Sequence, residues 1–209
     1  MSYKIKETYL TIQGEGAHAG RVAIFCRFTG CNLWSGNEKD RHKATCKFCD
    51  TDFVGTDGSG GGTFEDHEQL SDHILSFWNS RSKPFIVFTG GEPLLQLDKK
   101  LIIHLKNKDA QIAIETNGTI DPPEGIDWIC VSPKKDAKLL IKEGNELKIV
   151  YPQEDLDPSS YLDLDFEVFS LQPMDDSNYK NNLNKTLEYC TANPHWRLSL
   201  QMHKYLQIP

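Results

Sequence analysis

Three cysteines lie within one nineteen-residue window, in a pattern that can bind a metal or a cluster. Fourteen residues separate Cys31 from Cys46, and Cys49 follows Cys46 as the end of the word "CKFC". These thiols could hold a structural zinc ion, form a redox pair beside a third cysteine, or hold an iron–sulfur cluster. The choice among these three decides most of what the sequence says about function.

The surroundings of the cysteines favour the cluster. A structural zinc ion needs four closed ligands, and only His42 is at hand to complete the set. A thioredoxin-like pair would be followed by a helix, but "DTDFVGTDGSG" follows Cys49. A cubane held by three thiolates leaves one iron open for chemistry, and Phe48 supplies an aromatic neighbour between the paired thiols. Zinc and the redox pair stay open as weaker alternatives.

Composition narrows the class of protein. A chain of 209 residues with 38% hydrophobic content can bury one sizeable core, so we expect a single domain over residues 1–209. The net charge of −7 shows no excess of Lys and Arg, which argues against nucleic-acid binding. Neither an apolar span nor a signal segment is evident, so we expect a cytoplasmic protein without a membrane partner. Cys26, Cys130 and Cys190 stand in apolar runs and are interpreted as buried free thiols of a reducing compartment.

The elements that must position these residues alternate along the chain. Short apolar runs rich in β-branched and aromatic residues predict strands at 22–30, 84–90, 111–116, 127–132, 146–151 and 166–172. Helical spacing predicts helices within 63–80, capped by Thr63, and within 94–107 and 181–193. This order predicts an α/β fold with a largely parallel sheet, and residues 55–63 are expected to form a surface loop. Polar, glycine-rich motifs follow several of the predicted strands, so the site is expected at the carboxyl ends of these strands.

At this point the sequence resembles the radical S-adenosylmethionine (SAM) superfamily. The usual spacing there is Cys-x3-Cys-x-aromatic-Cys, so the long first gap is a departure. The word "FTGGEPLLQ" at 88–96 resembles the element of that superfamily that binds the amino group of SAM. Glycines permit close backbone approach and Glu92 offers a carboxylate to an ammonium, although a simple turn after a strand is the alternative. The resemblance implies an abbreviated, partial (β/α)6 barrel, with a cluster-binding and extended loop region at 31–63.

Further words narrow the resemblance to the 7-carboxy-7-deazaguanine synthase family. They are residues 11–36, "CDTDF" at 49–53 and "HKYLQIP" at 203–209. The likeness implies a lyase of queuosine and 7-deazapurine biosynthesis that converts 6-carboxy-5,6,7,8-tetrahydropterin into 7-carboxy-7-deazaguanine with loss of ammonia. It also implies a [4Fe-4S] cluster, SAM and Mg²⁺ as cofactors, a flavodoxin-like electron donor and a homodimer. The deoxyadenosyl radical would take hydrogen from C6 of the pterin, so the protein mainly positions the reactants and excludes water.

The resemblance also assigns residues. Cluster ligands are Cys31, Cys46 and Cys49, and the Mg²⁺ ligand is Thr51. The SAM side is assigned Phe48, Cys49, Asp50, Gly91, Glu92, Asn117, Ser132, Pro133, Lys134 and Gln172. The pterin side is assigned Ile12, Gln13, Gly14, Glu15, Arg27, Thr89, His203 and Pro209.

Several assignments carry an alternative. Arg27 suits a substrate carboxylate but could equally form a structural ion pair. The carboxylate of Pro209 is expected to reach the pterin, so that a C-terminal tag weakens substrate binding, whereas the plain alternative is the end of a strand. The remaining histidines are interpreted as surface or packing residues, namely His18, His42, His67, His73, His104 and His195. Two rival functions are an activase that makes a glycyl radical on a partner protein and a non-enzymatic zinc module.

Overall fold

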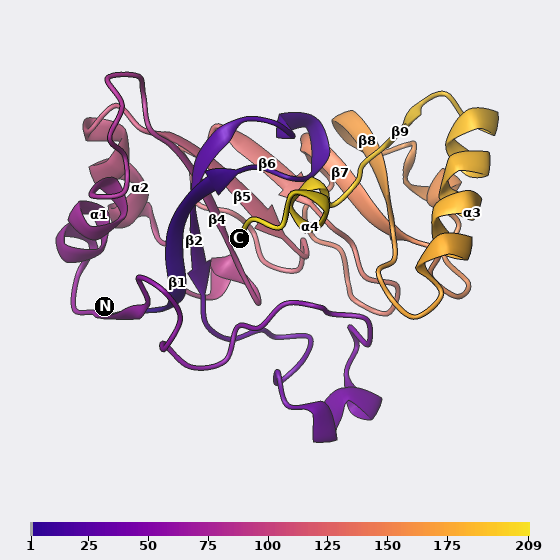
Figure 1. Ribbon diagram of the computed structural model, residues 1–209, viewed down its shortest axis with the longest axis horizontal. Coiled ribbons are helices and arrows are strands. Elements are labelled where there is room, and N and C mark those ends of the chain that lie inside the picture. The colour runs from indigo at the N-terminus through magenta and orange to yellow at the C-terminus, as the bar shows by residue number, and fades with distance from the viewer. Residues whose placement is uncertain (1) are drawn as a thin grey trace.

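One nine-stranded sheet forms the body of the protein, described for residues 2–209 by a computed structural model (Figure 1). The strand order is β3-β1-β2-β4-β5-β6-β7-β8-β9. β1 pairs antiparallel with β2 and β3, and every pair from β2 to β9 is parallel, which confirms the predicted largely parallel sheet. The strands are β1 Tyr3–Ile12, β2 Val22–Phe28, β3 Gly62–Phe64, β4 Phe85–Gly90, β5 Gln111–Thr116, β6 Trp128–Val131, β7 Glu143–Tyr151, β8 Asp165–Pro173 and β9 Trp196–Leu198.

The sheet curves into a partial barrel that does not close, because β3 and β9 end the strand order as its two edges. Figure 1 shows α1 (His67–Leu75) and α2 (Lys99–Asn107) outside one end of the sheet and α3 (Tyr179–Ala192) outside the other. Between β5 and β8 the described chain contains one short 3-10 helix, η4 (Pro158–Tyr161), and no α-helix. This confirms an abbreviated barrel with fewer helices than a full (β/α)6 arrangement.

The main hydrophobic core lies between the sheet and its outer helices. Side chains alternate across a strand, so Ile24, Cys26 and Phe28 of β2 point outward into one apolar cluster. The same cluster contains Leu101 and Leu105 of α2, which are fully buried. Burial of each such leucine contributes about 2 kcal/mol to stability.

The first helix begins later than the sequence predicts. Asp66, not Thr63, is the N-cap of α1, and its carboxylate accepts hydrogen bonds from the backbone N–H groups of Glu68 and Gln69. Thr63 belongs to β3 instead, so its assignment as a cap is wrong. The loop predicted at 55–63 is correspondingly shorter, because Gly62 and Thr63 pair with β1.

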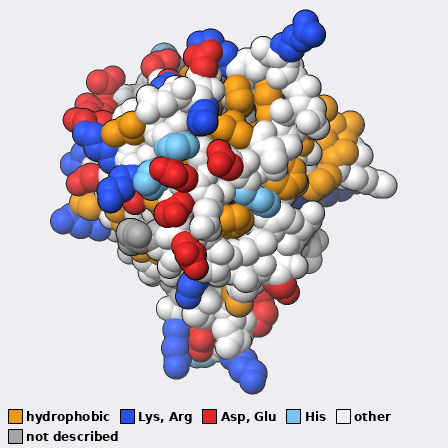
Figure 2. Space-filling view, turned by 90° about the vertical axis from the view of Figure 1, so that its left-hand side faces the viewer, with side chains coloured by type: hydrophobic (Ala, Val, Ile, Leu, Met, Phe, Trp, Pro, Cys, Tyr) orange, Lys and Arg blue, Asp and Glu red, His pale blue; other side chains and the backbone are white. Residues whose placement is uncertain are grey.

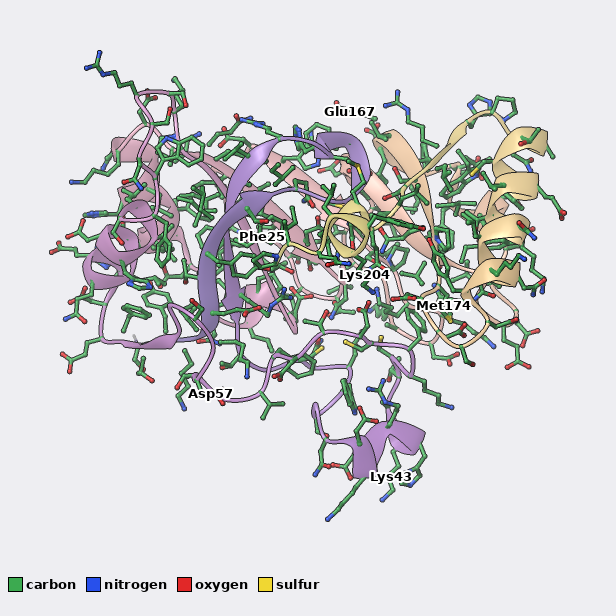
Figure 3. The ribbon with its side chains drawn as sticks, viewed as in Figure 1. Phe25, Lys43, Asp57, Glu167, Met174 and Lys204 are labelled. Atoms are coloured by element: carbon green, nitrogen blue, oxygen red, sulfur yellow. The ribbon has the colours of Figure 1, made fainter. Side chains whose placement is uncertain are left out.

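The ends of the chain differ most from expectation. β1 is a ten-residue strand that the sequence reading did not identify. The C-terminal residues do not end a strand, because they form the short helix α4 (Met202–Leu206), which also contains Lys204 (Figure 3). The Met202 N–H donates to the Gly14 carbonyl at 2.9 Å, which ties α4 to the residues that follow β1. No helix within residues 2–209 is long and apolar enough to cross a membrane.

Candidate active site

A cavity of about 410 Å³ opens at the carboxyl ends of the strands, inside the curve of the sheet. Parallel α/β sheets gather ligand sites there. Its wall contains all but two of the residues predicted for the site. These are Ile12, Gln13, Gly14, Glu15, Arg27, Cys31, Cys46, Phe48, Cys49, Asp50, Thr51, Thr89, Gly91, Asn117, Ser132, Lys134, Gln172, His203 and Pro209. The exceptions are Glu92 and Pro133, which are buried behind the wall.

The long gap between the first two cysteines folds away from the cavity. The backbone N–H groups of Thr45 and Cys46 both donate to the carbonyl of Leu33, at 3.0 and 3.5 Å. Because the two ends of the insertion meet at Leu33, the intervening residues project as a knob that contains the 3-10 helix η2 (Glu38–Lys43), at the bottom of Figure 1. The fourteen-residue spacing therefore lengthens the knob without separating the cysteines.

Aromatic packing holds the knob to the cysteine segment. Trp34 meets Phe53 edge to face at 5.6 Å, and Cys31 and Cys49 pack against the cluster that these rings form with Ala44. The Arg41 guanidinium lies 3.9 Å from the Trp34 ring. It also donates to the carbonyl of Cys49 at 3.1 Å, so the knob fixes the backbone beside a predicted cluster ligand.

The three thiols fit an iron–sulfur cluster better than a single ion. Among residues 2–209, they and His42 do not form a group whose ligand atoms all lie within 4.8 Å of one another. One tetrahedral zinc ion would need such proximity, whereas a cluster spreads its ligands over several irons. His42 is exposed and absent from the cavity wall. The hydrogen bond between Cys46 and Cys49 lowers the pKa of Cys49 and raises that of Cys46, so Cys49 is the thiol of this pair that ionises first.

The paired glycines of "TGGEP" line the cavity and also lie against the backbone that leads to the first cysteine. A Cβ on Gly91 would lie 2.1 Å from the carbonyl oxygen of Gly30 and 2.7 Å from Cβ of Cys31. A Cβ on Gly90, whose φ is +140°, would lie 2.2 Å from the carbonyl oxygen of Phe28. Only glycine permits this approach of the end of β4 to the first cysteine.

Glu92 is fully buried and already engaged. Its carboxylate accepts from the Thr116 hydroxyl at 2.8 Å and from the N–H groups of Asn117 and Leu94 at 2.8 and 3.0 Å. Burial raises the pKa of this carboxyl. Glu92 thus lies directly behind Thr116 and Asn117 on the wall, and its predicted contact with SAM stays a prediction.

On the same side, Lys134 bridges two predicted SAM residues. Its ammonium donates to the carbonyl and hydroxyl oxygens of Ser132 at 2.7 and 2.8 Å and lies 5.8 Å from the centre of the Phe48 ring. Burial lowers the pKa of Lys134. Gln172, from β8, accepts a hydrogen bond from Ser199 at 3.2 Å, which fixes its amide at the wall.

Three charged side chains meet on the cavity wall and form what we call the Lys148 cluster, which consists of Glu15, Glu115 and Lys148. The Lys148 ammonium lies 2.7 Å from a Glu15 oxygen and 2.6 Å from a Glu115 oxygen. The lysine side chain is only 4% exposed. Burial alone would lower the pKa of Lys148, but the two carboxylates outweigh it and raise the value well above normal. Since one cation faces two acids, burial raises the pKa of Glu115, whereas Lys148 outweighs burial and lowers that of Glu15.

The sequence alone does not assign Lys148 and Glu115 to the site. Glu115 is the one charge of "QIAIET", and Lys148 shares "ELKIVY" with Glu146, so charges within otherwise apolar strands are the available signal. Gln13 connects the Lys148 cluster to the predicted "QGEG" word, because its amide donates to Glu115 at 3.1 Å.

Arg27 lies on the cavity wall and also forms the structural ion pair that was its alternative. Its Nε donates to Glu7 at 2.7 Å and its Nη2 to the Tyr9 hydroxyl at 3.2 Å. Arg27 pairs in register with Thr89 of β4, so the two side chains stand next to each other on the wall.

The C-terminal segment covers part of the cavity mouth. Lys204 of α4, which is labelled in Figure 3, forms ion pairs with Asp50, at 2.7 Å, and with Asp175, which follows β8. The Pro209 oxygen accepts a hydrogen bond from the Thr11 hydroxyl at 2.8 Å. A Cβ on Gly14 would lie 2.4 Å from Nδ1 of His203, so the glycine of "QGEG" makes room for α4. Lys204 was not predicted from the sequence.

Comparison with known proteins decides the family. A family described as the Radical SAM superfamily matches residues 41–152. The 7-carboxy-7-deazaguanine synthases of Bordetella pertussis and Bradyrhizobium diazoefficiens are 54% and 55% identical to the chain, and each alignment covers all of both proteins. The chain belongs to the 7-carboxy-7-deazaguanine synthase family.

Solved structures agree with this family. The crystal structure of QueE from Escherichia coli superposes with a TM-score of 0.72 at 28% identity, covering 97% of this chain and 95% of that one. The superfamily match begins at residue 41 and so includes Cys46 and Cys49 but not Cys31, which lies before the knob. Radical SAM enzymes use a [4Fe-4S] cluster and SAM, and the three thiols and the glycine-dependent contact beside Cys31 fit those cofactors.

Proposed function

We propose that this synthase family member converts 6-carboxy-5,6,7,8-tetrahydropterin into 7-carboxy-7-deazaguanine with loss of ammonia. One observation carries the proposal: a single cavity is lined both by three thiols and by the Lys148 cluster. The thiols suit a cluster with SAM, and the charged groups offer donors and acceptors to a polar heterocycle with a carboxylate.

The chain's own residues bind and orient the reactants. The bound [4Fe-4S] cluster and SAM supply the radical chemistry. Around them, Phe48, Ser132 and Lys134 form the SAM side, while Gln13, Glu15 and Arg27 face the pterin. The apolar cluster of Trp34, Ala44 and Phe53 keeps water from the cysteine segment, as control of a reactive radical requires. Pro209 and His203 at the mouth complete the pterin side.

We assign Mg²⁺ to the hydroxyl of Thr51. The two neighbouring carboxylates are already paired with lysines, Asp50 with Lys204 at 2.7 Å and Asp52 with Lys6 at 2.9 Å. Thr51 stands between them on the cavity wall. Mg²⁺ keeps several waters and takes further ligands from substrate, so one protein hydroxyl is a sufficient anchor.

The electron donor and the oligomeric state follow from the family resemblance alone. We propose a flavodoxin-like donor, a homodimer and a cytoplasmic location, the last supported by six free cysteines. Light scattering of the purified enzyme tests the dimer, and replacement of dithionite by reduced flavodoxin tests the donor.

Anaerobic reconstitution tests the reaction itself. The enzyme is supplied with SAM, dithionite, Mg²⁺ and the carboxypterin, and 7-carboxy-7-deazaguanine and ammonia are measured. Cys31→Ala, Cys46→Ala and Cys49→Ala should abolish SAM cleavage and product formation. Cys26→Ala, Cys130→Ala and Cys190→Ala are matched controls and should retain both. Reconstituted wild type that cleaves SAM without making this product would refute the proposed substrate.

A further inference from the structure

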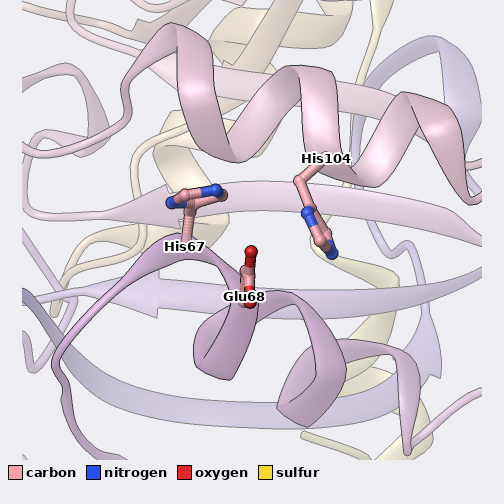
Figure 4. A group of neighbouring side chains, drawn as sticks. All are labelled: His67, Glu68 and His104. Carbon is pink, nitrogen blue, oxygen red and sulfur yellow. The ribbon is translucent and has the colours of Figure 1, made fainter.

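A second group of metal-binding side chains lies on the outer helices, away from the cavity. His67 and Glu68 belong to the first turn of α1, and His104 to α2. Their ligand atoms all lie within 4.8 Å of one another, and no other such group occurs within residues 2–209. Figure 4 shows Glu68 reaching from α1 toward α2, between the two imidazoles. None of the three lines the active-site cavity.

The three side chains are available to a ligand. The imidazoles meet edge to face with their centres 5.5 Å apart. His73, two turns along α1, instead bonds the Gly60 carbonyl at 2.8 Å and packs on Phe64. No comparable hydrogen bond or ion pair engages the side chains of His67, Glu68 or His104 among the residues described. Figure 2, which views the side of the molecule that carries α1 and α2, shows histidine side chains next to acidic ones on this surface.

We propose that His67, Glu68 and His104 form a binding site for a transition-metal ion of the Zn²⁺ class. Two imidazoles and one carboxylate are a ligand set that zinc takes, with water in the fourth position. Tetrahedral zinc holds its ligand atoms roughly 3.4 Å apart. The ligand atoms here lie within 4.8 Å of one another, so side-chain rotations that bring each pair closer by at most about 1.4 Å complete the site. Imidazole ligands discriminate against Mg²⁺, which prefers oxygen, so this site does not compete for the Mg²⁺ assigned to Thr51.

A metal ion bound at this site would cross-link α1 and α2. α1 and α2 cover the same apolar cluster on the outer face of the sheet, through Leu70 and Leu101 among others. An ion held by both helices binds the folded chain and not the unfolded one, so it raises the unfolding temperature. This cross-link stabilises the outer helices and leaves the active-site chemistry unchanged.

Calorimetric titration tests the site on enzyme that already holds its [4Fe-4S] cluster, so that the cluster cysteines do not capture the added ion. Zn²⁺ should bind wild type at one ion per chain and raise its unfolding temperature, and Mg²⁺ should do neither here. His67→Ala and His104→Ala should each weaken Zn²⁺ binding at least about tenfold and remove the thermal shift, with Glu68→Gln weaker in effect. His195→Ala, an exposed histidine outside the group, should behave as wild type.

Two results would overturn the site. One is wild type that shows no stoichiometric Zn²⁺ binding. The other is a His67→Ala/His104→Ala double variant that binds Zn²⁺ as tightly as wild type. The side chains of both histidines are partly exposed, and His67→Gln with His104→Gln provides a second pair that keeps more of the packing. Carboxypterin turnover without added Zn²⁺ should be unchanged in all of these variants, which separates failure of this site from failure of the proposed function.

Discussion

The two faces of the curved sheet bury different kinds of side chain. On the outer face, β2 and β4 contribute Ile24, Phe28 and Phe88 to an apolar core under α1 and α2. On the inner face, the same strands contribute Arg27 and Thr89 to the cavity, and β5 and β7 contribute Glu115 and Lys148.

The difference separates the residues that stabilise the fold from those retained for a ligand. Apolar burial stabilises the folded state roughly in proportion to area. Buried ion pairs gain little, because desolvation offsets much of their attraction, and apolar residues of similar size are often as stable. The Lys148 cluster is therefore poorly explained as a stabilising device. It is well explained as a set of fixed charges that a polar substrate meets.

Replacement of Lys148, the buried cation of the inner face, should have the largest effect on stability and turnover. Lys148→Met leaves Glu15 and Glu115 facing each other without a partner, so we expect a loss of about 3 kcal/mol of stability at neutral pH and turnover near background. The loss should shrink as the pH falls, because protonation of the acids removes their repulsion. Unfolding curves at several pH values and product assays measure both.

Lys106→Met is the matched control for this change. Lys106 is paired with Asp127 on the outer surface, where both side chains are about one third exposed. Exposed pairs contribute below about 1 kcal/mol. If Lys106→Met and Lys148→Met lowered the free energy of unfolding by equal amounts, the distinction between the two faces would be contradicted.

An outer-face change should lower stability and spare the chemistry. Leu101 is fully buried in the outer core, so Leu101→Ala should reduce the free energy of unfolding by about 3 kcal/mol. Iron content and turnover per folded molecule should match wild type below the unfolding transition. If folded Leu101→Ala lost its iron–sulfur cluster, the outer core would also be required for the shape of the cavity.

Thr51→Ala should have a smaller, more selective effect. Removal of the hydroxyl should decrease turnover at limiting Mg²⁺ by about tenfold, since the cation loses the one protein ligand assigned to it. The three thiols are unchanged, so iron content and SAM cleavage without pterin should persist. Turnover is measured against Mg²⁺ concentration. A curve identical to that of wild type would show that Mg²⁺ does not bind at Thr51.

The sequence predicted the site best where chemistry requires several residues at fixed spacing. Cys46 with Cys49 and the motifs "TGGEP" and "QGEG" are examples. Most of their residues line one cavity, whereas Gly16, Glu92 and Pro93 do not. It failed for Lys148 and Glu115, because each finds its partner on another strand only after folding, so no fixed spacing along the chain identifies the pair. Lys204 was missed for the same reason, since its partners Asp50 and Asp175 are distant in sequence.

Errors in the elements were local. Thr63 and Asp66 are both suitable helix caps, and pairing of Thr63 with β1 decides between them. β1 was missed although "YKIKETYLTI" contains alternating residues, because its lysines and threonines reduce its apolar character. Gly90 and Gly91 of "TGGEP" line the cavity, and their approach to a ligand stays a prediction; the structure adds a second reason for these glycines, because the backbone of Phe28 and Gly30 lies against them.

The smallest expected effect concerns the join between α4 and the cavity mouth. Burial alone would raise the pKa of Asp50, but its ion pair and hydrogen bond with Lys204 outweigh burial and lower it. A carboxyl whose pKa is lower in the folded than in the unfolded state adds stability that is complete above about pH 4 and is lost as the pH falls through the folded value. Lys204→Ala should therefore unfold at a slightly lower temperature than wild type at pH 7, and the difference should vanish in strong acid. Cluster-free protein suits this measurement, and Lys135→Ala, which removes an exposed pair with Asp155, is the control. A difference that grows as the pH falls would show that Lys204 holds α4 by something other than its charge.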